Sequence, residues 1–177
     1  SQRVLKGQLL GEVGLSGLTN YPHLHLTITQ GGDVVDPFAP SQTNACSEPL
    51  ETLWITTPPY TDAGLATVGV SDAVPELQAV QSGSARRATL SSNDALVLYA
   101  HAFHGNKHDR IEFEMSGPEG IVFEHTARLD EDQVQLMRAY GRRAPSQGWP
   151  TGAYRGYARL IRGDTILAVR HADVIVQ

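Results

Sequence analysis

Cysteine is almost absent from this sequence. The chain of 177 residues contains one, Cys46, so it cannot form an internal disulfide bond. The thiol is therefore either free and buried, or one half of a bridge to a cysteine upstream of Ser1. The sequence leaves both alternatives open.

Long apolar runs and an excess of basic residues are also missing. No stretch of eighteen or more consecutive apolar residues occurs, so the sequence predicts no membrane-spanning helix. The 14 Lys and Arg residues are outnumbered by 19 Asp and Glu residues, which gives a net charge of −5 at pH 7. Because nucleic-acid binding needs a basic surface to meet the phosphates, we expect no nucleic-acid partner.

An initial methionine and a signal-peptide pattern are absent as well. We therefore expect that more of the protein precedes Ser1. That part was removed as a leader, was cut away by a protease, or was left out of this sequence.

The composition that remains is typical of a globular, β-rich protein, with 41% hydrophobic residues and 17 glycines. We predict an all-β chain in three segments. Residues 1–45 form part of an antiparallel sheet domain, residues 46–62 are a linker rich in Pro, Ser and Thr, and residues 63–177 form an immunoglobulin-like β-sandwich.

Short alternating apolar runs separated by turn residues support the sandwich. Residues 95–103 are apolar on both faces and are predicted to be a central strand. Residues 104–109 are expected to form a hairpin that leads into a strand at 110–115. Residues 130–140 fit a strand or a helix capped by Asp130, and we favour the strand. The run Trp149–Tyr154 resembles the tyrosine corner of immunoglobulin-like domains.

Near the N-terminus we predict a strand at residues 4–13, broken by Gly7, a second strand at residues 22–29, and a hairpin turn at residues 30–33. Two histidines stand two residues apart in the predicted strand 22–29. Alternate residues of a strand point to the same face, so His23 and His25 are expected to project side by side. Such a pair can form half of a metal site or an acid/base pair. The alternative is a pair of surface histidines on a half-buried strand.

The surroundings of this pair resemble the closing motif of the lysostaphin-type zinc metallopeptidases, which cut peptides of bacterial cell walls. Residues 4–14 read V-L-K-G-Q-L-L-G-E-V-G, residues 22–28 read P-H-L-H-L-T-I, and residues 32–38 read G-D-V-V-D-P-F. The family pattern has these parts in the same order, with a glycine-containing loop before the histidines. The resemblance covers roughly the first forty residues.

The resemblance implies roles for four residues. In the family, zinc is held by a histidine and an aspartate of an upstream H-x-x-x-D motif and by the second histidine of H-x-H. His25 would then be a zinc ligand, and His23 the general base or the group that stabilises the transition state. Asn20 and Tyr21 are substrate-groove candidates. Tyr21 stands where the family usually has glycine, so the preferred substrate is expected to differ.

The upstream half of the zinc site is missing from this sequence. None of the seven histidines is followed four residues later by aspartate. The resemblance therefore implies two further zinc ligands upstream of Ser1, and a chain that is inactive unless the N-terminal part of the same precursor stays associated with it.

Three functions follow as hypotheses. The favoured one is a zinc-dependent metalloendopeptidase whose substrate is a peptidoglycan peptide, periplasmic or secreted and associated with the cell envelope. The second is a degenerate, non-catalytic regulator or scaffold of cell-wall hydrolases. The third is a β-sandwich module that binds wall polymer or a partner protein.

Two other groups of residues have plainer interpretations. His101, His104, His108 and Asp109 could be mistaken for a metal site, but we interpret them as a solvated hairpin tip. The arginines form scattered basic spots, interpreted as solvated surface with contact to an anionic wall polymer as the alternative. They are Arg86, Arg87, Arg142, Arg143, Arg159 and Arg162.

Overall fold

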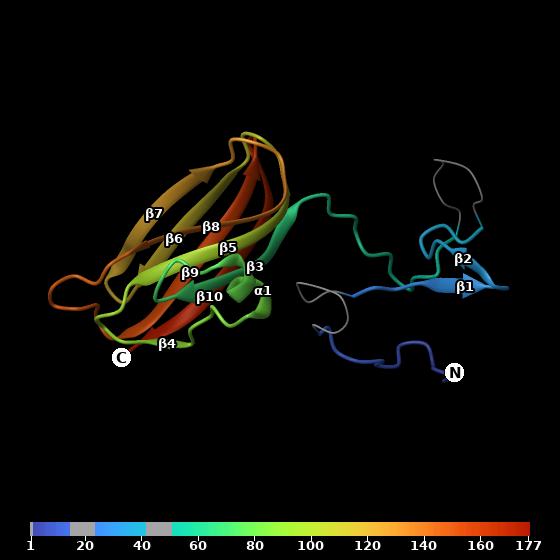
Figure 1. Ribbon diagram of the computed structural model, residues 1–177, viewed down its shortest axis with the longest axis horizontal. Coiled ribbons are helices and arrows are strands. Elements are labelled where there is room, and N and C mark those ends of the chain that lie inside the picture. The colour runs from blue at the N-terminus through green and yellow to red at the C-terminus, as the bar shows by residue number, and fades with distance from the viewer. Residues whose placement is uncertain (1, 15–23, 42–50) are drawn as a thin grey trace. The chain divides into compact units, whose positions relative to one another are not determined.

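The chain divides into two compact units, Ser1–Thr61 and Asp62–Gln177. The computed structural model describes residues 2–14, 24–41 and 51–177 (Figure 1). Each unit is described by itself below.

Unit 1 contains a short antiparallel hairpin of β1 (Ile28–Gln30) and β2 (Asp33–Val35). Gly31 and Gly32, with φ of 65° and 102°, occupy the two turn positions. A two-residue hairpin of this type needs positive φ at both positions, which glycine adopts without strain. The predicted turn at residues 30–33 is confirmed.

The strand predicted at residues 4–13 is wrong, and the one predicted at residues 22–29 is shorter than expected over the part that the structure describes. Within the described part of unit 1, residues 2–14 form no strand, and the chain turns where the Gln8 amide donates to the carbonyl of Leu5 at 3.0 Å. Residues 24–27 are not in a strand either, and β1 begins at Ile28. A strand extends only as far as its partner, and β2 offers three residues for pairing.

The end of unit 1 is anchored by an aromatic pair. Phe38 and Trp54 lie with their ring centroids 5.5 Å apart, and the Leu53 amide donates to the carbonyl of Pro37 at 2.9 Å. Asp36 makes the preceding turn, because its Oδ1 accepts the amide of Phe38 at 2.8 Å. Residues 52–54 thus pack on the segment that follows β2.

Unit 2 is a sandwich of two sheets, and all but one of its strand pairs are antiparallel (Figure 1). The exception is the parallel pair of β10 with β4. The first sheet has the order β3 (Gly64–Ser71), β5 (Leu96–Gly105), β8 (Gln133–Arg142). The second has the order β4 (Thr89–Leu90), β10 (Thr165–Val176), β9 (Gly152–Arg162), β6 (Arg110–Gly117), β7 (Gly120–Arg128). A short helix, α1 (Leu77–Ser82), follows β3.

The core of unit 2 lies between these sheets. Alternate residues of the facing strands supply it, as the twofold period of a strand requires. Its fully buried members include Leu98 of β5, Phe113 of β6 and Leu160 of β9. A smaller cluster of Val80, Ala85 and Tyr99 is also buried. The prediction of an all-β chain with a β-sandwich is confirmed.

Three predicted features of unit 2 are confirmed in detail. Residues 96–103 lie in β5, the central strand of its sheet, and residues 133–142 form a strand rather than a helix. The tyrosine corner is present, since the hydroxyl of Tyr154 donates to the carbonyl of Pro150 at 2.8 Å.

The hairpin predicted at residues 104–109 is wrong. β5 and β6 belong to different sheets, so this segment crosses from one layer of the sandwich to the other. Both edges of β5 are occupied by β3 and β8, and those of β6 by β7 and β9. The crossing bends at His104 and His108, which have φ of 50° and 75°.

The described residues contain no helix with both the length and the apolar composition to cross a membrane.

Candidate functional site

His25 is the one member of the predicted peptidase site that the structure describes. Its side chain is exposed, in the segment just before β1. The ring Nε2 lies 3.2 Å from the hydroxyl of Thr27. Residues 25 and 27 therefore point to the same side of an extended chain, as alternate residues do. This hydrogen bond holds the imidazole in one orientation.

The other predicted site residues, Asn20, Tyr21 and His23, lie outside the described residues, and so does Cys46. The shared face of the two histidines and the roles of Asn20 and Tyr21 remain predictions.

Among the residues that the structure describes, no group of three or more His, Cys, Asp or Glu side chains is arranged to hold a metal ion. His25 therefore belongs to no such group among the described residues. A catalytic zinc site uses three protein ligands and keeps a fourth position open.

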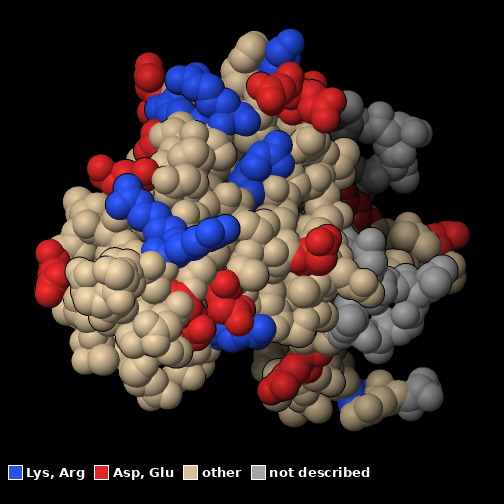
Figure 2. Space-filling view, turned by 60° about the vertical axis from the view of Figure 1, so that its left-hand side comes forward, with Lys and Arg blue, Asp and Glu red and all other residues tan. Residues whose placement is uncertain are grey.

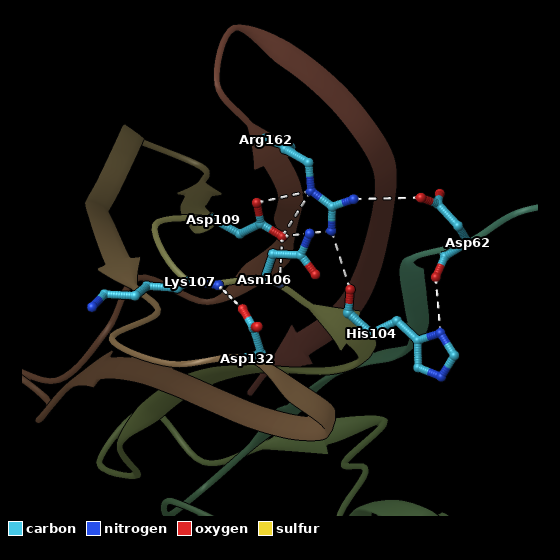
Figure 3. Close-up of polar contacts among 7 residues, drawn as sticks. All are labelled: Asp62, His104, Asn106, Lys107, Asp109, Asp132 and Arg162. Atoms are coloured by element: carbon cyan, nitrogen blue, oxygen red, sulfur yellow. Dashed lines mark hydrogen bonds and ion pairs between the residues drawn. The ribbon is translucent and has the colours of Figure 1, made fainter.

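A second candidate site lies in unit 2, around Arg162 at the end of β9 (Figure 3). Its guanidinium forms a fork on Asp109, with Nε 3.1 Å from Oδ1 and Nη2 2.9 Å from Oδ2. It also donates to the carbonyl of His104 at 3.2 Å and lies 3.4 Å from the carboxylate of Asp62. One arginine therefore joins the crossing segment, the end of β9 and the first residue of unit 2.

Asp109 is the buried centre of this cluster, with 2% of its side chain exposed. Burial alone raises the pKa of this carboxyl. Hydrogen bonds from Arg162 and from the amide of Asn106, together with the positive charge of Arg162, outweigh burial and hold the pKa below its usual value. Asp109 is therefore a charged acceptor that fixes the turn.

A pocket of about 400 Å³ opens beside the cluster and is lined by polar groups. Asp62 and Asp132 contribute carboxylates, and His104 contributes an imidazole whose Nδ1 lies 3.0 Å from the carbonyl of Asp62. Asp132 accepts the amide of Lys107 at 2.6 Å (Figure 3). The arrangement can accept hydrogen bonds from amines or hydroxyls, but each polar group named already holds the crossing segment in place. We interpret this cluster as a structural clamp.

The four residues interpreted as a solvated hairpin tip divide into two exposed and two buried ones. His104 and His108 are exposed, whereas His101 and Asp109 are buried. His101 lies within β5, with its Nε2 2.9 Å from the amide nitrogen of Gln135 on β8, and burial lowers its pKa. The alternating pattern of β5 could have indicated the burial of His101, because both faces of that strand are apolar.

The interpretation of the arginines as solvated surface is wrong for Arg162, which is paired with a buried carboxylate. Arg159 is also paired, with Glu114 at 3.1 Å. Figure 2 shows basic and acidic side chains intermingled over the face in view, without a broad area of one sign.

No protein-family model and no curated protein matches this chain. Solved structures resemble it at low identity. The C-terminal domain of wzt is 9% identical with a TM-score of 0.45, over 67% of this chain and 75% of that one. The CARDB domain of the PF1109 protein from Pyrococcus furiosus is 14% identical with a TM-score of 0.42, over 72% and 97%. A Bifidobacterium dentium β-glucuronidase is 12% identical with a TM-score of 0.39, over 66% and 18%.

Proposed function

We propose that this chain carries the C-terminal part of a zinc-dependent metalloendopeptidase that cuts peptides of the bacterial cell wall. The observation that carries the proposal is the ordered sequence pattern of residues 4–14, 22–28 and 32–38. A lone H-x-H would be weak, but here it stands between a matching glycine-rich segment and a matching V-D-P turn. Such a substrate puts the protein in the periplasm or outside the cell, associated with the envelope.

The geometry of unit 1 supports the proposal at the residues that are described. His25 is exposed, and a hydroxyl two residues away orients its ring. The glycine turn and the hairpin of β1 and β2 come directly after it, followed by the turn at Asp36. Asp36 serves that turn by accepting the amide of Phe38, so we do not assign it to a metal.

The described residues alone do not complete a zinc site, because no three of their His, Cys, Asp or Glu side chains are grouped to hold a metal ion, and a catalytic zinc needs three protein ligands. The proposal therefore concerns the protein to which this chain belongs, with two ligands contributed from upstream of Ser1. In that protein His25 would be the third ligand, and His23 would act as a general base or stabilise the transition state. We expect the isolated chain to be inactive.

The test is zinc content and peptidoglycan hydrolysis by the precursor, compared with its His25→Ala and His23→Ala variants. We expect His25→Ala to lose both zinc and hydrolysis. His23→Ala should lose hydrolysis and keep zinc. His108→Asn is the matched control, because it removes an exposed imidazole of unit 2 and asparagine tolerates positive φ. Zinc content and hydrolysis that are undiminished in His25→Ala would refute the proposal.

The regulator hypothesis makes a different prediction for the same experiment. A degenerate relative would carry no H-x-x-x-D motif upstream and would bind no zinc in the unmodified precursor. Zinc measured before any substitution therefore separates the enzyme from the regulator.

A further inference from the structure

A groove of about 400 Å³ in unit 2 is lined by three basic side chains, Arg86, Arg170 and His171, and by the hydroxyl-bearing Thr67. None of the described residues that line it is acidic. The whole chain carries a net charge of −5, so a cationic groove runs against the overall balance. A cleft lined by charges of one sign raises the local concentration of ligands of the opposite sign.

The groove is built where two strand edges approach. β3 pairs on one edge, with β5, and its other edge has no strand partner among the described residues. β10 pairs with β9 on one edge, and on the other edge only its last two residues pair, with β4. Both strands shift register beside the groove, β3 between Leu65 and Thr67 and β10 between Ile166 and Ala168. Such bulges turn side chains out of the regular pleat.

Arg170 spans these two edges. Its Nε donates to the carbonyl of Leu65 on β3 at 2.5 Å, which fixes the direction of the guanidinium. Within the described chain, its two terminal nitrogens form no hydrogen bond or ion pair. A guanidinium held at one nitrogen presents the other two as a fork that matches a carboxylate.

Arg86 reaches the groove from the loop after α1 and is exposed. The carboxylate of Asp173 lines the adjoining hollow with Arg86. Asp173 is already held by Arg155, with hydrogen bonds of 2.6 and 2.9 Å. No carboxylate of the described residues lies within ion-pair distance of Arg86, in contrast to its neighbour Arg87, which pairs with Asp72 at 3.3 Å.

We propose that the groove between β3 and β10 binds the carboxylates of an acidic peptide. The two strand edges suit an extended peptide backbone, and Arg86, Arg170 and His171 suit its side-chain or terminal carboxylates. The choice of a wall peptide as the natural source rests on the proposed function. The site is separate in residues from His25 and belongs wholly to unit 2.

The test uses the full chain and two blocked synthetic peptides of equal length, one with two glutamates and one with glutamines in their place. Calorimetric titration at low salt should show binding of the glutamate peptide at least about tenfold tighter than the glutamine peptide, and weaker binding as salt is added. Arg86→Gln should lower the affinity for the glutamate peptide about tenfold. Arg143→Gln, an exposed arginine outside the groove, is the control and should bind as the parent does.

Equal affinity for the two peptides, no binding of either, or an Arg86→Gln variant that binds like the parent would overturn the inference. Inorganic phosphate that displaces the peptide at equal concentration would overturn the peptide as occupant. His25→Ala should leave this binding unchanged, so that a failure of the proposed enzyme and a failure of the groove give different results.

Discussion

Asp109 is a buried carboxylate whose negative charge is balanced by a neighbouring arginine. Arg162 supplies the charge and the forked hydrogen bonds, and the amide of Asn106 supplies a further donor. Removing one partner of a buried pair leaves the other charge without compensation, which costs more than the pair contributes in net terms.

We therefore expect Arg162→Gln to lower the free energy of unfolding by about 3 kcal/mol. Urea denaturation of the parent and the variant at neutral pH measures this change in the free energy of unfolding. Arg159→Gln is the matched control, because its pair with Glu114 is partly exposed and should be worth at most about 1 kcal/mol. Equal losses in the two variants would show that burial of Asp109 does not matter.

The same pair predicts a pH dependence. Because the pKa of Asp109 is lowered in the folded state, its contribution is complete above the unfolded value of about 3.9 and is lost as the pH falls through the lower folded value. Without Arg162, burial raises the pKa of Asp109, so the carboxyl of the variant takes up a proton at a higher pH than that of the parent. The stability difference between the parent and Arg162→Gln should therefore be largest at neutral pH and shrink as the pH falls into the acidic range. Denaturation curves over that range check it, and a difference that grew on acidification would contradict it.

Tyr99 and Tyr154 form a contrasting pair of buried hydroxyls. That of Tyr154 donates to Pro150, whereas that of Tyr99 has no hydrogen-bond partner among the described residues. Burial raises the pKa of Tyr99, which the charges of Arg86 and Arg87 partly offset. We expect Tyr99→Phe to be neutral or stabilising by up to about 1 kcal/mol, and Tyr154→Phe to cost about 1 kcal/mol. Thermal or urea unfolding of both variants measures these changes, and a Tyr99→Phe variant that loses as much stability as Tyr154→Phe would contradict the prediction.

At the residue scale, the sequence could predict what is local. The tyrosine corner spans five residues of one segment, so its pattern is visible in the chain. The pairing of Asp109 with Arg162 joins the crossing segment to the end of β9, far apart in sequence, and nothing local marks either residue as the partner of the other.

At the scale of elements, the approach of β3 to β5 depends on a missing side chain. A Cβ at Gly69 would lie 2.2 Å from the hydroxyl oxygen of Tyr99 and 2.3 Å from its Cζ. The aromatic ring thus crosses directly over the backbone of the neighbouring strand.

Gly69→Ala should therefore destabilise unit 2 by about 2 kcal/mol, because the ring must leave its place. The double variant Gly69→Ala/Tyr99→Leu should recover part of that loss, because the shorter side chain leaves room for the added methyl. Chemical denaturation of the three proteins forms a double-mutant cycle, and purely additive effects would show that the clash is relieved elsewhere.

The crossing segment at residues 104–109 shows why one element was mispredicted. A polar turn between two alternating runs has the same local chemistry whether the runs pair or enter different sheets. The choice depends on β3 and β8, which occupy both edges of β5. Strand lengths in unit 1 were overestimated for a related reason, since β2 limits β1.

At the scale of the whole molecule, the described residues of the two units differ in how much apolar surface they bury. Every residue of the two hydrophobic clusters lies in unit 2, whereas Leu5, Leu9 and Leu24 of unit 1 are exposed. Unit 2 therefore has its own core and meets the usual condition for folding alone.

We expect a fragment of residues 62–177 to unfold cooperatively, with a midpoint in urea close to that of the same transition in the full chain. Circular dichroism on both proteins measures this. A fragment that is unfolded in buffer would show that residues 1–61 contribute to the stability of unit 2.

The fold class was predictable because alternation of apolar residues reports strands wherever they pair. The peptidase function rests on a motif, and it stays a proposal, since His23 lies outside the described residues and His25 has no companion ligands among them. The cationic groove was not predictable, because it needs Arg86, Arg170 and Thr67 from three separate segments.

The parallel pairing of β4 with the end of β10 carries a consequence for folding kinetics. Thr89 and Leu90 meet Ile175 and Val176, so this edge of the second sheet closes only when distant parts of the chain have found each other. Closing a loop of that length has an entropic cost before any contact compensates for it. Refolding of unit 2 should accordingly take milliseconds to seconds, the slow range of two-state domains, and β4 is expected to dock late.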